Sequence, residues 1–181
     1  MKVTETKLKD CFIVEPVVFK DSRGYFYESF SQNNFNELIG RTVNFVQDNE
    51  SFSSKGVLRG LHFQTGEHAQ AKLVRAIKGT VLDVVVDMRK ESPTFSQHFS
   101  IELSEDNKKQ LFVPRGFAHG FMVLSDSAIF CYKCDNFYNK ASERGLRYDD
   151  PYLGIDWRLP TTELVVSEKD LKLPTLSTLI L

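Results

Sequence analysis

Four histidines, at positions 62, 68, 98 and 119, are the first candidates for chemistry in this sequence. A neutral imidazole accepts a proton near neutral pH, and each is therefore a candidate general base or metal ligand. His62 lies in RGLHFQ and His119 in PRGFAHGF, compact motifs whose glycines predict an irregular strand or a close backbone approach. His68 lies in a glycine-containing loop and His98 among polar residues, so we assign these two structural or solvated roles.

PRGFAHG, residues 114–120, has the Pro-x-Gly-x-x-His spacing of the second metal motif in cupin barrels. The first motif of such barrels supplies His-x-His and then a carboxylate, whereas the matching segment here is His62-Phe63-Gln64, with Glu67 further on. Gln64 replaces a ligand histidine, and fewer good ligands remain than metal sites of this architecture need. The sequence therefore predicts a barrel of cupin type without a metal. A metal-dependent cupin, an oxygenase or isomerase, is an alternative that tightly held iron, zinc or manganese would revive.

Proton transfer is the most economical use of an imidazole in a metal-free barrel mouth. The resulting carbanion needs a neighbouring carbonyl, with a donor or cation at the carbonyl oxygen. Lys72 fits that role, because it shares a strand face with alternate apolar residues after the His62 loop. Arg59 and His62 are three residues apart and would face opposite sides of a regular strand. A bulge at Gly60 is needed to turn both side chains inward.

The length of 181 residues suits one domain with a proper core, and we expect a single domain over residues 1–181. With 23 basic and 24 acidic residues, the net charge of −1 argues against a general nucleic-acid surface. It leaves room for a basic pocket that binds one small anion. The N-terminal MKVTETKLKDCFIVEP lacks the apolar run of a signal peptide, and no segment approaches the ~20 apolar residues of a membrane span.

The three cysteines cannot all pair within one chain, so we expect free thiols and a cytoplasmic protein. Cys131 and Cys134 form a CxxC in a predicted strand, where an odd separation places them on opposite faces. The chain has no second CxxC. We therefore interpret these two cysteines as packing residues, not as a zinc or redox pair.

Many short runs of β-forming residues, rich in phenylalanine and separated by turn residues, predict a mostly β fold. We expect a cupin-type antiparallel jelly-roll barrel with a few short helices. One helix is predicted over 31–40, with Ser31 as N-cap and Gly40 as its end. A second short helix is predicted within 167–174, capped by Ser167. The predicted strands are residues 11–19, 24–30, 44–49, 57–64, 71–78, 80–88, 96–103, 110–114, 121–124 and 128–134.

Long motifs follow one another along the chain, from DSRGYF (21–26) onward. They are GVLRGLHFQ (56–64), HAQAKLVRAIKGTVLDVVVDMRKESPTF (68–95), SEDNKKQLFVPRGFAHGFMVLSDSA (104–128), YKC (132–134), ERGLRYDDPYLGIDW (143–157) and SEKD (167–170). This order closely resembles the dTDP-4-dehydrorhamnose 3,5-epimerase family. The resemblance implies a metal-free cupin jelly roll, usually a homodimer, that inverts carbons 3 and 5 of a nucleotide-linked 4-keto-6-deoxyhexose. It implies no NAD or metal, because the ketone that acidifies both carbons is already present.

The resemblance also implies catalytic roles. His62 matches the base, and Asp170 of SEKD would orient it and stabilise its charge. Lys72 would stabilise the enolate oxygen. Tyr132 of YKC would return a proton from the opposite face of the sugar, which makes the outcome inversion.

Nucleotide contacts follow from the same resemblance. Arg23 and Arg59 match the diphosphate partners, because guanidinium forks suit phosphate oxygens. Tyr138 matches an aromatic residue that stacks on the thymine ring. The other positions that match ligand contacts are Glu28, Gln47, Asp48, Asn49, His119, Glu143 and Lys169. Phe63 replaces an expected tyrosine, and CDNFY (134–138) differs from a threonine-containing version beside the stacking residue.

Two other functions remain open at this level. One is an epimerase that inverts a single carbon or accepts another nucleotide, such as CDP. The other is a sugar- or nucleotide-binding cupin without catalysis. Deuterium incorporation at one or two carbons separates the first from the double epimerase, and the effect of His62→Ala on ligand binding and on rate identifies the second.

Overall fold

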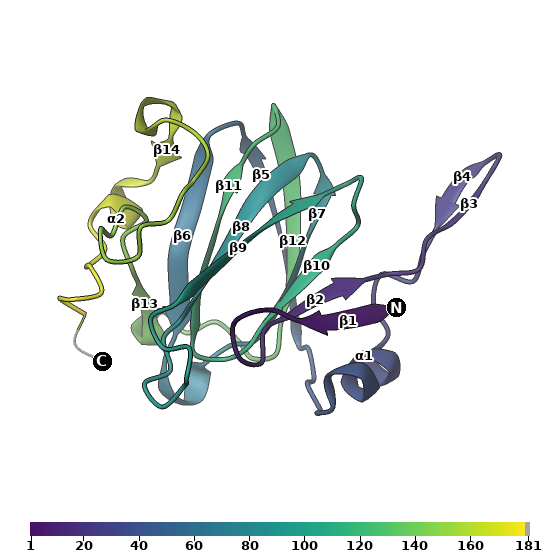
Figure 1. Ribbon diagram of the computed structural model, residues 1–181, viewed down its shortest axis with the longest axis horizontal. Helices are drawn as coiled ribbons and strands as arrows, with labels where there is room; N and C mark the ends of the chain where they lie inside the picture. Colours follow the sequence, from purple (N-terminus) through teal and green to yellow (C-terminus); the bar gives the residue numbers. More distant parts are fainter. Residues whose placement is uncertain (180–181) are drawn as a thin grey trace.

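Two antiparallel sheets face each other in the computed structural model, which describes residues 1–179 (Figure 1). The first sheet has the order β1 (Lys2–Glu5), β2 (Phe12–Glu15), β10 (Gln110–Val113), β7 (Lys72–Lys78), β12 (Ser127–Cys134) and β5 (Gln47–Ser54). The second has the order β13 (Glu143–Gly145), β6 (Val57–Gln64), β11 (Phe117–Val123), β8 (Thr80–Asp87) and β9 (His98–Ser104). Short β14 (Val165–Val166) pairs parallel with β6. This architecture confirms the predicted jelly-roll barrel.

Apolar side chains fill the space between the two sheets because alternate residues of each strand point inward. Val74 and Phe130 of the first sheet pack there with Val85 and Phe121 of the second, and all four are buried. A second apolar cluster lies on the other face of the second sheet, where Trp157 and other residues of the C-terminal segment cover it. Strand β8 is therefore buried on both faces.

The two predicted helices are present. Helix α1 (Gln32–Ile39) ends at Gly40, whose φ of 69° is left-handed, as a helix stop of this kind requires. Ser31 precedes it, but only its carbonyl takes part, accepting a hydrogen bond from Phe35 N at 2.8 Å. Helix α2 (Glu168–Leu171) is capped by the side chain of Ser167. Short 3-10 helices occupy η1 (Gly66–His68), η2 (Lys140–Ser142) and η3 (Thr161–Glu163).

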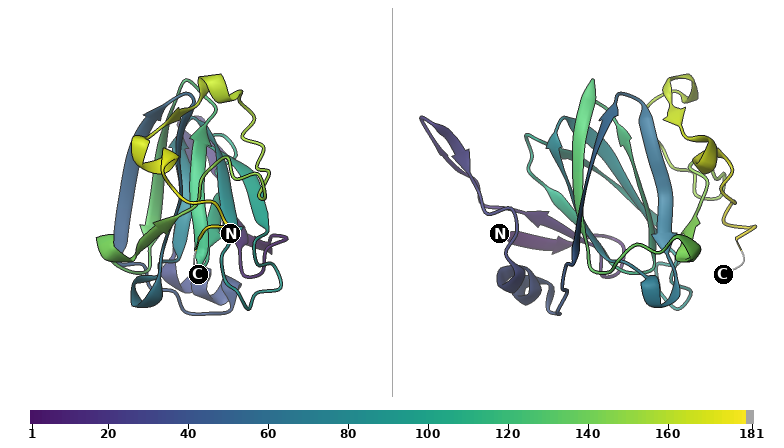
Figure 2. Two further views of the ribbon diagram at one scale, coloured as in Figure 1. Left: turned by 90° about the vertical axis from the view of Figure 1, so that its left-hand side faces the viewer. Right: turned by 180° about the vertical axis from the view of Figure 1, so that it is seen from behind.

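The predicted strand over 11–19 is wrong in its second half. Strand β2 ends at Glu15, before a proline that has no N–H for the ladder. Instead, β3 (Phe19–Asp21) pairs with β4 (Gly24–Phe26) in a separate hairpin. This hairpin extends away from the barrel, on the side opposite the C-terminal segment (Figures 1 and 2).

Strand β11 begins at Phe117, four residues before the strand predicted over 121–124. His119 therefore lies within a strand, and every residue of that strand is buried. No helix within residues 1–179 is long and apolar enough to span a membrane.

Candidate active site

Strand β6 carries the irregularity that the sequence required at Gly60. His62 pairs with His119 and Arg59 pairs with Phe121, so three steps along β6 match two steps along β11. Gly60 has a φ of 128°, and a Cβ there would lie 2.6 Å from Gly120 Cα. Only glycine fits this close approach of two backbones. As a result, Arg59 and His62 line the same cavity.

That cavity, which we call the barrel cavity, has a volume of about 510 Å³. Both sheets contribute walls to it: Arg59 and His62 come from β6, whereas Lys72 and Tyr132 come from β7 and β12. Helix α2 adds Asp170 to its lining. A second cavity of about 180 Å³ shares some of these residues and continues toward the loop after β12.

His62 is held by a carboxylate from the far end of the chain. Its Nε2 lies 2.7 Å from Asp170 Oδ1, across 108 residues of sequence. Donation of the Nε2 proton to the carboxylate leaves Nδ1 as the proton acceptor. The His62 side chain is 28% exposed and that of Asp170 only 5%, so the imidazole keeps access to solvent while its partner does not.

Burial raises the pKa of Asp170, but donors around the carboxylate outweigh it. The hydrogen bond and charge of His62 act with the backbone N–H of Gly60 and with Ser167 to hold the pKa below its ordinary value. Ser167 Oγ also accepts a hydrogen bond from Asp170 N at 3.1 Å, which fixes the start of α2. The carboxylate is therefore ionised at neutral pH.

Tyr132 and Lys72 face His62 from the opposite sheet. Burial raises the pKa of Tyr132, so its phenol keeps its proton at neutral pH. The Nζ of Lys72 lies 5.8 Å from the centroid of the Tyr132 ring. Burial lowers the pKa of Lys72, while the charges of Asp83 and Glu143 act in the opposite direction.

A second histidine–aspartate pair lies on the side of the second sheet that faces the cavity. His119 Nε2 is 2.8 Å from Asp83 Oδ2, and the side chains are 7% and 0% exposed. Asp83 Oδ1 is buried and has no hydrogen-bond partner in the described part of the chain. Burial raises the pKa of Asp83, and His119 and Lys72 oppose this rise. His119 itself lines the barrel cavity.

The second cavity is lined by polar residues predicted to contact the nucleotide. Tyr138 is 54% exposed, and its hydroxyl donates to Glu143 Oε2 at 3.0 Å. Lys169 Nζ donates to the same oxygen at 2.7 Å. Gln47 Nε2 donates to Asn49 Oδ1 at 3.0 Å on the neighbouring strand β5. Four elements thus meet at the second cavity: strand β5, the loop after β12, strand β13 and helix α2.

Three predicted site residues lie elsewhere in the chain. Arg23 pairs with Asp21 in the projecting hairpin, and Glu28 accepts a hydrogen bond from Asn34 on helix α1. Neither residue lines the barrel cavity. Asp48 points to the outer face of the first sheet, where it pairs with Lys133 at 2.9 Å.

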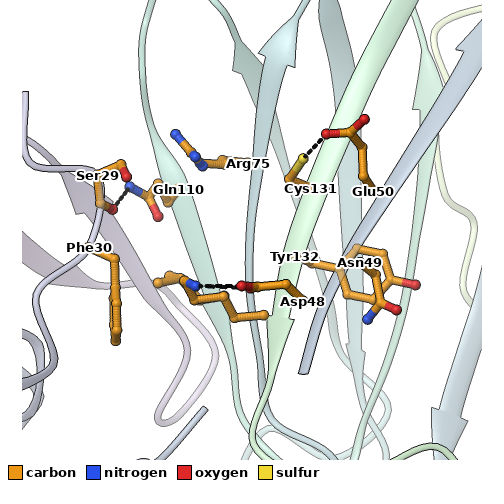
Figure 3. A pocket seen from close by; sticks show the side chains of 11 residues that line it. Ser29, Phe30, Asp48, Asn49, Glu50, Arg75, Gln110, Cys131 and Tyr132 are labelled. Carbon is orange, nitrogen blue, oxygen red and sulfur yellow. Dashed lines mark hydrogen bonds and ion pairs between the residues drawn. The ribbon is translucent and has the colours of Figure 1, made fainter. Parts of the chain in front are cut away.

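Figure 3 shows the outer pocket, of about 290 Å³, that Asp48 lines. Cys131 lies on this face and donates to Glu50, while Cys134 lies among the residues that line the second cavity. The prediction that the two cysteines face opposite sides is confirmed, and all three cysteines are free. Cys134 is buried and also borders the same cavity as Lys72.

Two residues of the site were not singled out in the sequence. Asp83 had a signal, since a carboxylate in the apolar run TVLDVVVDM predicts a buried charge that needs a partner. No sequence pattern indicated Ser53. Its hydroxyl accepts a hydrogen bond from Arg59 Nε at 3.1 Å and so directs the guanidinium.

Gln64, at the position of a cupin metal ligand, is engaged with the backbone. Its Oε1 accepts a hydrogen bond from Asn139 N at 3.0 Å. Within residues 1–179, no three side chains of His, Cys, Asp or Glu come together in a group that could hold a metal ion.

The chain is similar to known proteins over almost its whole length. The family model described as dTDP-4-dehydrorhamnose 3,5-epimerase matches residues 5–178. A protein of that name from Salmonella typhimurium is 53% identical, with 100% of this chain and 98% of the relative covered. The crystal structure of a dTDP-4-dehydrorhamnose 3,5-epimerase from Elizabethkingia anophelis is 56% identical, with a TM-score of 0.95 and coverage of 98% and 97% of the two chains.

A dTDP-6-deoxy-D-glucose-3,5-epimerase from Legionella pneumophila was solved in complex with dTDP-4-keto-L-rhamnose. It is 46% identical to this chain, with a TM-score of 0.94 and coverage of 99% and 94%. The match of the family model and the identity to these relatives agree with the resemblance found in the motifs. The chain belongs to the dTDP-4-dehydrorhamnose 3,5-epimerase family.

Proposed function

We propose that this protein is an isomerase that inverts carbons 3 and 5 of dTDP-4-dehydro-6-deoxy-D-glucose to give dTDP-4-dehydro-L-rhamnose. The main support is the placement of two proton-transfer groups on opposing sheets of one cavity, His62 on β6 and Tyr132 on β12. Inversion of a carbon requires a proton to leave one face and another to arrive on the opposite face. Membership of the family supports the same reaction.

His62 begins the reaction as the general base. Its Nδ1 takes the proton from a carbon beside the C4 ketone, and the C–H electron pair forms a carbon–carbon double bond. The carbonyl π electrons move to the ketone oxygen, which becomes an enolate. The ammonium of Lys72 lines the same cavity and stabilises that oxygen. Because carbons 3 and 5 both flank the ketone, one set of groups serves both inversions.

Tyr132 completes the reaction as the general acid. Its phenol gives a proton to the opposite face of the same carbon, and the enolate collapses to the ketone with inverted configuration. His62 is then an imidazolium and Tyr132 a phenolate. A proton must pass from one to the other through solvent before the next inversion, and the 28% exposure of His62 gives it access to solvent. Ionised Asp170 stabilises the imidazolium in the meantime.

The remaining polar residues bind the nucleotide in this proposal. Arg59 is held by Ser53 at the cavity and faces the diphosphate. Exposed Tyr138 stacks on the thymine ring, beside Gln47. The other contacts come from Asn49, His119, Glu143 and Lys169. No cofactor is needed, because the substrate already carries the ketone.

A second copy of the chain supplies the missing contacts of Arg23 and Glu28. The Arg23 side chain is 88% exposed in a hairpin that extends away from its own barrel (Figures 1 and 2). The same hairpin exposes Phe19 by 63% and Phe26 by 70%. Aromatic surface of this size indicates burial against a partner. We propose a homodimer in which each hairpin reaches the other copy's site.

Mixed dimers test this arrangement. Arg23→Ala and His62→Ala proteins are mixed and allowed to exchange subunits. A mixed dimer then has one site with both intact residues, so a 1:1 mixture recovers roughly a quarter of the wild-type rate, because half of the dimers are mixed and each has one of two sites intact. If Arg23 serves the site of its own chain, no intact site forms and no activity returns.

Turnover in deuterated water tests the reaction. Purified protein and dTDP-4-keto-6-deoxyglucose should give product with deuterium at both carbon 3 and carbon 5, measured by NMR. A coupled rhamnose-pathway reductase should then oxidise NADPH. Deuterium at one carbon only would replace the proposal with a single epimerisation, and binding without any exchange would indicate a binding protein.

We propose the cytoplasm as the site of action, because all three thiols are free.

A further inference from the structure

Asp83 has a buried carboxylate oxygen that the catalytic scheme leaves unexplained. The side chain is 0% exposed, and Oδ1 has no hydrogen-bond partner among residues 1–179. Buried polar atoms in native proteins nearly always have a partner, since an unpaired one has a desolvation cost of about 1–3 kcal/mol. A positive charge nearby would offset this cost without a direct hydrogen bond, and the charge of Lys72 opposes the rise that burial causes in the pKa of Asp83.

The orientation of Asp83 within its strand directs it toward the cavity. On β8, Val81 and Val85 point into the core between the sheets, whereas Leu82 and Val84 point into the cluster behind the second sheet. Asp83 alternates with the first pair, so its side chain points toward the first sheet. His119 on β11 holds Oδ2 at 2.8 Å, which leaves Oδ1 free.

Lys72 is the cation on the opposite sheet, toward which the side chain of Asp83 points. It comes from β7 of the first sheet and lines the barrel cavity together with His119. Within the described residues its Nζ forms no hydrogen bond or ion pair. The charges of Lys72 and Asp83 act on each other in both directions. An ammonium that lines the cavity and a buried carboxylate oxygen, neither with a direct hydrogen-bond partner among the described residues, thus face the same space between the sheets.

We propose that Asp83 is a positioning residue for the epimerisation, which holds Lys72 as an ammonium directed at the enolate oxygen while His119 fixes the carboxylate. This inference rests on the proposed function. Lys72 can stabilise an enolate only when it carries a charge, and burial favours its neutral form. The titratable and charged groups around Lys72 come from every neighbouring element: Asp83 of β8, Glu143 of β13, Arg59 and His62 of β6, His119 of β11, Tyr132 and Cys134 of β12, and Lys169 and Asp170 of α2.

Asp83→Asn tests the proposal, because it keeps the shape of the side chain and removes the charge. We expect kcat to fall about 100- to 1,000-fold, as for loss of one preorganised group at an oxyanion, with little change in KM. The basic limb of the pH–kcat profile should move to lower pH, since Lys72 loses its proton more easily. An unchanged profile with a small loss of kcat would overturn the proposal.

Asp87→Asn is the matched control on the same strand. Asp87 is also 0% exposed, but Arg89, Ser92 and Thr94 all donate to its carboxylate, and it lines neither cavity. We expect this variant to lose thermal stability and to keep the wild-type pH profile. A matching shift of the profile in both variants would mean that Asp83 acts only through the stability of β8.

A double-mutant cycle with Lys72→Met asks whether Asp83 acts through Lys72. In that background, Asp83→Asn should change the residual exchange of deuterium by no more than a few-fold. Full additivity of the two losses would overturn the proposal.

Thermal unfolding tests the pair without activity and without the Asp83 variant. If Lys72 compensates the charge of Asp83 without direct contact, Lys72→Met leaves a buried carboxylate uncompensated and the midpoint of unfolding stays level or falls. If the two charges do not compensate each other, replacement of Lys72 by an apolar residue raises the midpoint and refutes the pairing. A wild-type protein without exchange activity would refute the proposed function, and this measurement would still decide the pairing.

Discussion

The molecule contains two histidine–aspartate pairs that differ in how they are built. His62 and Asp170 join a strand to the short helix α2, and the histidine is 28% exposed. His119 and Asp83 join neighbouring strands of one sheet, and the histidine is 7% exposed. Both pairs have nearly the same separation, 2.7 Å and 2.8 Å. Their chemistry therefore differs because of access to water and not because of contact geometry.

The open pair suits proton transfer, and the closed pair suits fixed electrostatics. A base that turns over must release its proton after each inversion, and His62 has solvent access for that. His119 and Asp83 are enclosed by the β11–β8 ladder and by apolar side chains, so the orientation of the pair is preorganised. The pKa values of the two aspartates also shift in opposite directions: the pKa of Asp170 is below its ordinary value, and that of Asp83 is above it.

Replacing the open base should have the largest effect. His62→Ala removes the proton acceptor, so we expect kcat to fall about 100- to 10,000-fold, with binding of dTDP unchanged. Exchange of deuterium into substrate measures the loss, and calorimetry measures binding. His98→Gln is a control, because His98 lies on β9 and lines neither cavity. A His62→Ala protein that retained full exchange would place the base elsewhere.

Tyr132→Phe should separate removal of the proton from inversion. The ring and its packing remain, while the acid on the opposite wall is lost. We expect epimerised product to fall about 100- to 1,000-fold, whereas exchange with solvent on the His62 face continues. The ratio of exchanged substrate to product, measured by NMR, reports this directly. Equal loss of exchange and product would mean that the two sheets do not supply separate proton donors and acceptors.

Asp170→Asn tests the role of charge within the open pair. A hydrogen bond to a charged group contributes about 1.5–3 kcal/mol, which corresponds to about 10- to 150-fold in kcat. The effect should be smaller than that of His62→Ala, because the base itself remains. A loss as large as that of the His62 variant would indicate that Asp170 takes part in proton transfer directly.

Stability toward acid should depend on the same carboxylate. The pKa of Asp170 is lower in the folded protein than its ordinary value, so its contribution is complete above about pH 4 and is lost as the pH falls below that value. Asp170→Asn should therefore flatten the loss of thermal stability as the pH falls below about 4. An unchanged pH dependence in the variant would show that other carboxylates account for the acid transition.

The sequence predicted the barrel and most of the open pair but little of the closed one. Alternating short strands were enough for the two sheets, and the motif around SEKD led to Asp170. The pair formed by Asp83 and His119 was missed because the apolar run TVLDVVVDM holds two carboxylates with the same local signal. Asp83 borders the site and Asp87 binds Arg89, and only the neighbouring strands distinguish them.

The projecting hairpin shows a different limit. Residues 24–30 were expected to form a strand of the barrel, yet β4 pairs only with β3 outside it. β-Forming residues indicate a strand but not which sheet it joins. In the dimer that we propose, the predicted roles of Arg23 and Glu28 depend on a second copy of the chain, which local sequence patterns cannot reveal.

The smallest expected effect tests how each pair is anchored. Asp83 is held by ladders to both β9 and β11, whereas Asp170 depends on a helix of four residues whose first turn is capped by Ser167. Loss of such a cap costs about 0.5–2 kcal/mol, so Ser167→Ala should loosen α2 and lower kcat a few-fold. Exposed Ser54 on β5 provides the control variant, Ser54→Ala, which should keep the wild-type rate.

Amide exchange in the Ser167→Ala protein should rise at residues 168–171 and stay unchanged at Asp83, since only the open pair is anchored by the cap. Equal loosening at both aspartates would mean that the two pairs form one cooperative unit and that their different anchors have no consequence for catalysis.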